Sequence, residues 1–142
     1  EAKEILSDYL KLRPEIKNIN DYEKVDISIQ GGFLLLSKKA YEYLYQLLNE
    51  YGEFLKIDVD GCEMILFNLR VFGQEDLDKC IEDYSKGVRS GFKSFAFIDS
   101  DINSKLLFKS KLLDGIGLFC GEEFKQLVIQ RKLNGIEFNE IN

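Results

Sequence analysis

The sequence contains no histidine among its 142 residues. Histidine is the side chain that most often serves as a general base near neutral pH, and it is also a common zinc ligand. Its absence excludes Ser–His and Cys–His pairs for nucleophilic catalysis. Lysine or carboxylate chemistry stays open, but no spacing in the chain singles out such groups, so the sequence predicts no catalytic residues and no enzyme.

Cysteine is scarce, with only Cys62, Cys80 and Cys120. An odd number of cysteines without close spacing is typical of reduced thiols in a cytoplasm rather than of a disulfide framework. No pair has the CxxC spacing of a structural zinc site. We therefore expect no metal and no cofactor.

Long apolar runs are also missing, because no stretch approaches the roughly 20 apolar residues that a transmembrane helix needs. No signal-peptide pattern is visible either. Together with the cysteine usage, these absences predict a cytoplasmic protein without a membrane partner.

Basic residues are outnumbered, 19 against 25 acidic ones, which gives a net charge of −6. They are scattered, and the only doublets are Lys38-Lys39 and Arg131-Lys132. Such a surface does not favour nucleic acid, whose binding depends on neutralising phosphates. It suits a basic protein partner by steering the encounter, although solubility alone also explains it.

The composition predicts a single α+β domain over residues 1–142, since 45% of the chain is hydrophobic and no Pro- or Ser-rich linker interrupts it. An apolar stripe at helical spacing predicts an N-terminal helix over 2–11, and Pro14 discourages its continuation. A polar loop over 15–24 completes the N-terminal region 1–24. Residues 25–142 then form the core, a mixed or antiparallel sheet with two main packed helices.

Two stretches of this core, Leu34–Val59 and Leu118–Ile141, share one pattern. Each has an apolar triplet, a capping residue (Ser37 or Gly121), an amphipathic helix, a glycine at the predicted left-handed helix end (Gly52 or Gly135) and an alternating strand. The pattern predicts two similar strand–helix–strand units, although the ordinary succession of strands, helices and glycine turns would give the same pattern. The residues predicted to bury the two helices are Leu44, Leu47, Leu48, Phe124 and Leu127.

The segments between these units carry further signals. Asp60-Gly61 predicts a two-residue turn that pairs 54–59 with 63–71 in an antiparallel hairpin. The acidic stretch 74–84 has apolar residues at the spacing of a short helix. Residues 95–98 and 106–108 read as strands, with a turn at 99–101.

Asp99, Asp101 and Asn103 match the start of a calcium-binding loop. Ser104 stands where that loop requires glycine and Ser110 where it requires glutamate, so the sequence indicates a polar turn. For partner binding, Tyr45 is a candidate anchor at the edge of the first helix's apolar stripe. The candidate rim charges are Glu75, Asp76, Asp78, Glu82 and Asp83; a solvated helix face would explain them equally well.

The segments FLLLSKKAYEYLYQLL and LFCGEEFKQLVIQRKLNGIEF resemble the immunity proteins of bacterial polymorphic toxin systems. More narrowly, they are similar to the eleventh and forty-third numbered immunity families, the former first known as a domain of unknown function. The resemblance covers roughly residues 30–142 and rests on Ser37, Phe124, Gly135 and Phe138. The chain departs from the pattern at Gly121, where serine is usual.

The resemblance implies a cytoplasmic antidote that binds one cognate toxin domain and blocks it by direct protein–protein interaction. No catalytic residues come with the family. The alternative is a small cytoplasmic ligand-binding regulator or a carboxylate-dependent enzyme using residues such as Asp99 and Asp101. The oligomeric state is left open by the sequence.

Overall fold

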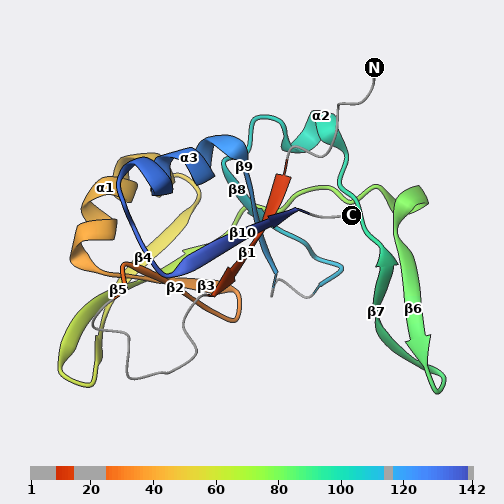
Figure 1. Ribbon diagram of the computed structural model, residues 1–142, viewed down its shortest axis with the longest axis horizontal. Helices are drawn as coiled ribbons and strands as arrows, with labels where there is room; N and C mark the ends of the chain where they lie inside the picture. The colour runs from red at the N-terminus through yellow and green to blue at the C-terminus, as the bar shows by residue number, and fades with distance from the viewer. Residues whose placement is uncertain (1–8, 15–24, 114–116, 141–142) are drawn as a thin grey trace.

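The computed structural model describes residues 9–14, 25–113 and 117–140. In these residues the chain forms two four-stranded sheets, a two-stranded hairpin and three α-helices (Figure 1). All pairs of named strands are antiparallel, so the α+β prediction is confirmed with antiparallel sheets.

The first sheet has the order β10-β1-β9-β8, and the second has the order β2-β3-β5-β4. The strands of the first sheet are β1 (Tyr9–Pro14), β8 (Leu107–Lys109), β9 (Leu118–Gly121) and β10 (Ile136–Glu140). Those of the second are β2 (Ile27–Gln30), β3 (Phe33–Leu36), β4 (Gly52–Val59) and β5 (Cys62–Leu69). The hairpin and the helices are β6 (Ile81–Ser85), β7 (Val88–Ser94), α1 (Lys38–Leu48), α2 (Asp99–Ile102) and α3 (Glu122–Gln130).

Both sheets use the same local connection. Helix α1 joins β3 to β4, and these two strands flank β5. Helix α3 joins β9 to β10, and these flank β1. In each sheet, therefore, the two strands that a helix connects are not neighbours. A strand from outside that strand–helix–strand unit lies between them and is antiparallel to both.

The two sheets meet where β2 approaches the start of β10, and Asp26 joins them. Its carboxylate accepts hydrogen bonds from Ser37 Oγ at 3.0 Å and from the backbone amide of Asn134 at 3.2 Å. In return, the Asp26 amide donates to Asn134 Oδ1 at 2.8 Å. Because Ser37 caps α1 and Asn134 lies between α3 and β10, this side chain joins the two halves, together with the Asn134 carbonyl, which accepts the Asp26 and Ile27 amides.

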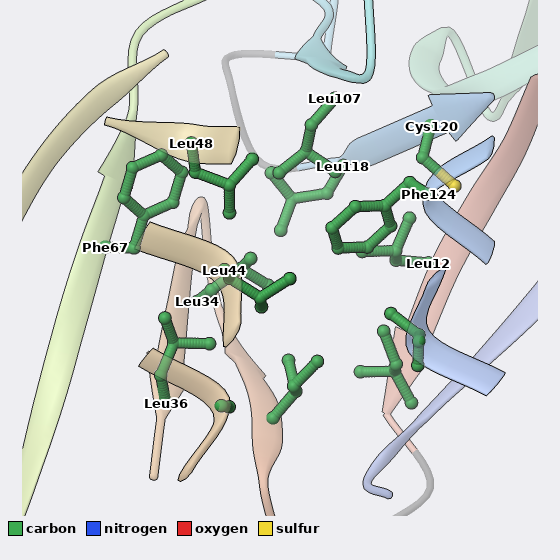
Figure 2. Close-up of a cluster of buried hydrophobic side chains, with 14 of the residues drawn as sticks. Leu12, Leu34, Leu36, Leu44, Leu48, Phe67, Leu107, Leu118, Cys120 and Phe124 are labelled. Atoms are coloured by element: carbon green, nitrogen blue, oxygen red, sulfur yellow. The ribbon is translucent and has the colours of Figure 1, made fainter. Parts of the chain in front are cut away.

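Helices α1 and α3 lie side by side over the two sheets and share one core (Figure 1). In Figure 2, apolar side chains from both helices and both sheets point toward one another, among them Leu34, Leu44, Leu48, Phe67, Leu118 and Phe124. Leu44, Leu48 and Phe124 are fully buried, as expected. Burial of such side chains from four elements is what holds the layers together.

The burial of Leu47 was predicted wrongly, since this side chain is 39% exposed. On α1 the buried positions are Ala40, Leu44 and Leu48, which repeat at intervals of four. Leu47 lies beside this line and faces a shallow groove between α1 and α3, whose opposite wall includes the partly buried Leu127.

The capping prediction holds at the start of α1, where Ser37 Oγ accepts the Ala40 amide at 3.1 Å. The two glycines predicted to end the helices lie instead at the start of the next strand, because Gly52 is the first residue of β4 and Gly135 directly precedes β10. A Cβ on Gly52 would lie 2.1 Å from the Asn68 carbonyl oxygen, and one on Gly135 would lie 1.9 Å from that of Ile27. Close approach of a neighbouring strand therefore requires glycine at both positions, and Gly135 also has a positive φ of 117° that favours glycine.

The N-terminal helix prediction is wrong at Tyr9–Lys11, which begin the central strand β1 of the first sheet. Leu10 and Leu12 are buried while Lys11 and Arg13 alternate with them, a period-two pattern that the helical stripe obscured. Residues 2–8 of that helix and the loop 15–24 lie outside the described residues. The strand β1 is thus part of the core, through Leu10 and Leu12.

The hairpin at Asp60-Gly61 is confirmed, with β4 paired to β5 from Val59↔Cys62 to Gly52↔Leu69. Both turn residues have positive φ, 53° at Asp60 and 85° at Gly61, as a two-residue turn of this kind requires. The strand predicted at 95–98 reduces to a single bridge at Phe97, since the regular pairing ends at Ser94.

Leu44→Ala and Leu47→Ala form a matched pair on one helix, because the residue type is the same and only the burial differs. We expect Leu44→Ala to lower the free energy of unfolding by about 2–5 kcal/mol through lost burial and a residual cavity. Leu47→Ala should cost about 1 kcal/mol or less. Urea denaturation of the two variants checks this; equal losses would contradict the packing described.

Candidate partner-binding surfaces

The most exposed regular element is the β6–β7 hairpin, called here the hairpin arm (residues 81–94). It projects from the end of the molecule opposite α1 and β4 (Figure 1). Its turn at Lys86-Gly87 has positive φ at both residues, 55° and 82°, which suits a two-residue hairpin turn. Two irregularities in the β6–β7 register interrupt its ladder.

The hairpin arm exposes large apolar side chains instead of burying them. Ile81 is 54% exposed, Tyr84 57% and Val88 69%. Leu77, just before the arm, is 69% exposed. One such residue alone has little meaning, but four in and beside one short element make the arm a candidate for contact with a protein partner.

The base of the arm is attached to a second, aromatic core. Phe92 contacts Phe95 edge-on, and Phe95 in turn contacts Phe97 and Phe119. Phe97, Phe108 and Phe119 are at most 3% exposed. The arm is therefore fixed at its root by ring packing while its outer part stays accessible.

The acidic segment 74–84 is not helical, contrary to the prediction. It contains a single 3-10 turn, Leu77–Lys79, and then β6. Pairing of β6 with β7 overrides the weak helical pattern, because the ladder supplies partners for backbone groups that a short helix would leave unpaired.

Glu75 belongs to the body of the protein. One of its carboxylate oxygens accepts hydrogen bonds from Ser110 Oγ at 2.6 Å and from the amides of Lys111 and Leu112. Desolvation by partial burial tends to raise the pKa of Glu75, but these hydrogen bonds outweigh it and hold the pKa below the ordinary glutamate value. The bonds tie the segment before the arm to the chain after β8.

The other candidate rim charges lie on or near the arm. Glu82 accepts a bond from Tyr84 Oη at 2.7 Å and lies 3.4 Å from Arg89 Nη1. The hydrogen bond to Glu82 raises the pKa of Tyr84, so this hydroxyl stays protonated. Asp76 lies 3.9 Å from Lys79 Nζ, whereas the exposed Asp78 and the half-buried Asp83 form no ion pair within the described residues. Two of these four acidic residues, Asp76 and Glu82, thus have a basic partner nearby.

Tyr45 lies elsewhere, at the end of the molecule formed by α1 and β4. Its ring is 5.5 Å from both Tyr41 and Phe54, and Phe54 continues the cluster to Phe67 in the core. Tyr45 is 38% exposed. The structure therefore separates Tyr45 from the acidic candidates by the long dimension of the molecule (Figure 1).

Asp99 lines a cavity of about 520 Å³ together with Lys105, Glu122, Glu123 and Glu140. Asp101 is engaged beside it: Lys105 Nζ and the Gln74 amide both donate to its carboxylate at 2.8 Å. The hydrogen bond from Lys105 lowers the pKa of Asp101, so this group stays ionised and supports the local fold. Within the described residues, no group of three or more Cys, Asp or Glu side chains could hold a metal ion.

The exposed residues of the arm were missed by the sequence analysis. The sequence holds little signal for this hairpin, because residues 81–85 show no regular alternation of apolar and polar side chains. Gly87 accepts the positive φ of the turn, but one glycine does not distinguish a hairpin from a loop. The spacing of Leu77, Cys80, Ile81 and Tyr84 favoured a short helix instead.

Comparison of the chain with protein-family models gives no match, and comparison with curated proteins gives none that is significant. In the described part of the chain, no helix is both long and apolar enough to cross a membrane.

Glu75→Ala should lower the free energy of unfolding by about 1–3 kcal/mol, because it leaves the fully buried Ser110 hydroxyl and the Lys111 amide without this acceptor, whereas the Leu112 amide keeps Ser110 Oγ. Exposed Asp78→Ala is the control and should change stability by about 0.5 kcal/mol or less. Since the folded-state pKa of Glu75 is lowered, its stabilisation is complete above the ordinary glutamate pKa and is lost as the pH falls through the folded value. Denaturation at neutral and acidic pH checks this; a loss independent of pH would contradict the role of the charge.

Proposed function

We propose that this protein is an immunity protein that binds a cognate bacterial toxin domain and neutralises it by direct contact. The observation that carries the proposal is the hairpin arm, an exposed element whose outer apolar side chains Ile81, Tyr84 and Val88 are not used by either core. The sequence resemblance to immunity families supplies the biological context. A cytoplasmic location follows as part of the same proposal.

The arm has the properties of a protein-binding element. Ile81, Tyr84 and Val88 would supply apolar and aromatic contacts, the kind that contribute most of the affinity at interfaces. Their burial by a partner removes apolar area from water, which the free protein leaves unburied. Glu82 and Asp83 would lie at the rim, where charges influence the rate of association more than the affinity.

The root of the arm favours binding with little rearrangement. Phe92 and Phe95 continue the ring packing of the aromatic core, so the arm leaves the body in a defined direction. A preorganised element loses less conformational entropy when it binds than a flexible loop does. Tyr45 stays a prediction as a contact residue, since one partner would have to span the molecule to reach both ends.

We also infer that Leu34–Val59 and Leu118–Ile141 are two units of similar design. The shared crossover around β5 and β1 supports this, as do the strand-opening glycines at positions 52 and 135. The arm, which follows the first unit and precedes the second, is then an addition to a doubled framework and is free to carry the binding surface.

The test uses the toxin domain encoded beside this protein's gene, expressed with and without the antidote. We expect the wild-type protein to bind it one-to-one and to restore growth. Ile81→Ser and Tyr84→Ala should each weaken binding at least about tenfold, as expected for exposed anchors that become buried in the complex.

Ile129→Ser is the matched control, because Ile129 on α3 is 53% exposed against 54% for Ile81. It should leave affinity and protection unchanged. Absence of binding by the wild type would overturn the proposed function. Equal effects of Ile81→Ser and Ile129→Ser, measured by calorimetric titration, would overturn the role of the arm.

A further inference from the structure

We propose that β4 is a second interaction surface, through which two copies of this chain join their sheets edge to edge. This inference does not depend on the toxin partner. It starts from the place of β4 at the end of the order β2-β3-β5-β4, where its outer side pairs with no other strand in the described residues.

The hairpin register shows which backbone groups of β4 face outward. Val59 and Cys62 flank a two-residue turn, which makes them a hydrogen-bonded pair, and hydrogen-bonded pairs then recur at every second position. The amides and carbonyls of Val59, Ile57 and Leu55 therefore face β5. Those of Phe54, Lys56 and Asp58 face away from the sheet, as an adding strand requires.

The side chains along this edge are also unprotected. Leu55 is 60% exposed and lines a hollow of about 520 Å³ with Phe33 and Leu66 on the sheet face away from α1. Lys56 is exposed and has no ion pair in the described chain. Charged residues on an edge strand normally discourage pairing, so the register must compensate for the charge of Lys56.

An antiparallel pair of β4 strands related by a two-fold axis has three central registers. With the axis at Lys56, the two ammonium groups oppose each other. With the axis at Leu55, Lys56 faces Phe54 and its charge stays uncompensated. With the axis at Ile57, Lys56 of each copy faces Asp58 of the other, which forms two reciprocal ion pairs.

Charge complementarity therefore favours a second copy of this chain as the partner of β4, with the two-fold axis at Ile57. Asp58 uses Oδ1 to accept the Gly61 amide, which leaves Oδ2 for the ammonium group. Leu55 then lies opposite Val59 of the other copy. The two Phe54 residues are six positions apart along the joined strands, about 20 Å, so each α1 lies clear of the other.

This register makes a specific cross-linking prediction. Ile57 on the axis belongs to a non-hydrogen-bonded pair, in which the Cα atoms lie about 4.5 Å apart, within the range that a disulfide spans. Under mild oxidation Ile57→Cys should form a covalent dimer, whereas Leu55→Cys should form several-fold less. The wild type controls for Cys62, Cys80 and Cys120, and mass mapping identifies the linked residues.

Non-covalent association is tested by sedimentation of the full chain over a concentration series. Lys56→Pro removes one outward amide without removing a bond to β5, because edge strands tolerate proline at such positions. Lys56→Ala removes the same side chain and keeps the amide. We expect dimerisation to fall at least tenfold in Lys56→Pro and by a smaller factor in Lys56→Ala, with both variants folded by circular dichroism.

A wild type that stays monomeric at every concentration, or a Leu55→Cys dimer that forms as fast as that of Ile57→Cys, would overturn the proposal. Unchanged dimerisation in folded Lys56→Pro would also overturn it. None of these results bears on toxin binding by the hairpin arm, so the two proposals fail independently.

Discussion

The arrangement of the body depends on the junction at Asp26. This residue bonds to the cap of α1 and to the segment that leads from α3 into β10, so it joins the two sheets. Only with the sheets in this relation do α1 and α3 face one common core, in which Leu44 and Phe124 are both fully buried. Gly135 is needed at the same place, because any larger residue would collide with β2.

The elements outside this shared core differ in how firmly they are packed. The aromatic cluster around Phe97 and Phe119 fixes the root of the hairpin arm but not its tip. The arm has only its own two-stranded ladder, and isolated ladders of this size are marginally stable in water. Exposed apolar side chains at such a position contribute little to folding, so their presence favours a role in binding.

The sequence predicted the parts of the fold that local patterns determine. Ser37 and the Asp60-Gly61 turn act over a few residues and lie where they were expected, and so does the α1 stripe except at the exposed Leu47. The sequence did not predict what depends on distant pairing. Tyr9–Pro14 form a strand because β9 and β10 lie on either side of them, a relation that spans most of the chain.

The candidate site was predicted less well for the same reason. Glu75 looked like a surface charge until the fold brought Ser110 and Lys111 to its carboxylate. Tyr45 and the acidic segment lie at opposite ends of the molecule, which no helical wheel could show (Figure 1). The exposure of the apolar side chains of the arm depends on the pairing of β6 with β7 outside both cores, which the sequence did not predict.

The central claim is that the body carries the stability of the fold while the hairpin arm remains available for a partner. Native-state hydrogen exchange of the free protein tests this most directly. The account predicts that amides of β1, β5 and β9 exchange only through global unfolding, whereas those of β6 and β7 exchange through local opening at much lower free energy. Protection of the arm equal to that of the central strands would contradict the account.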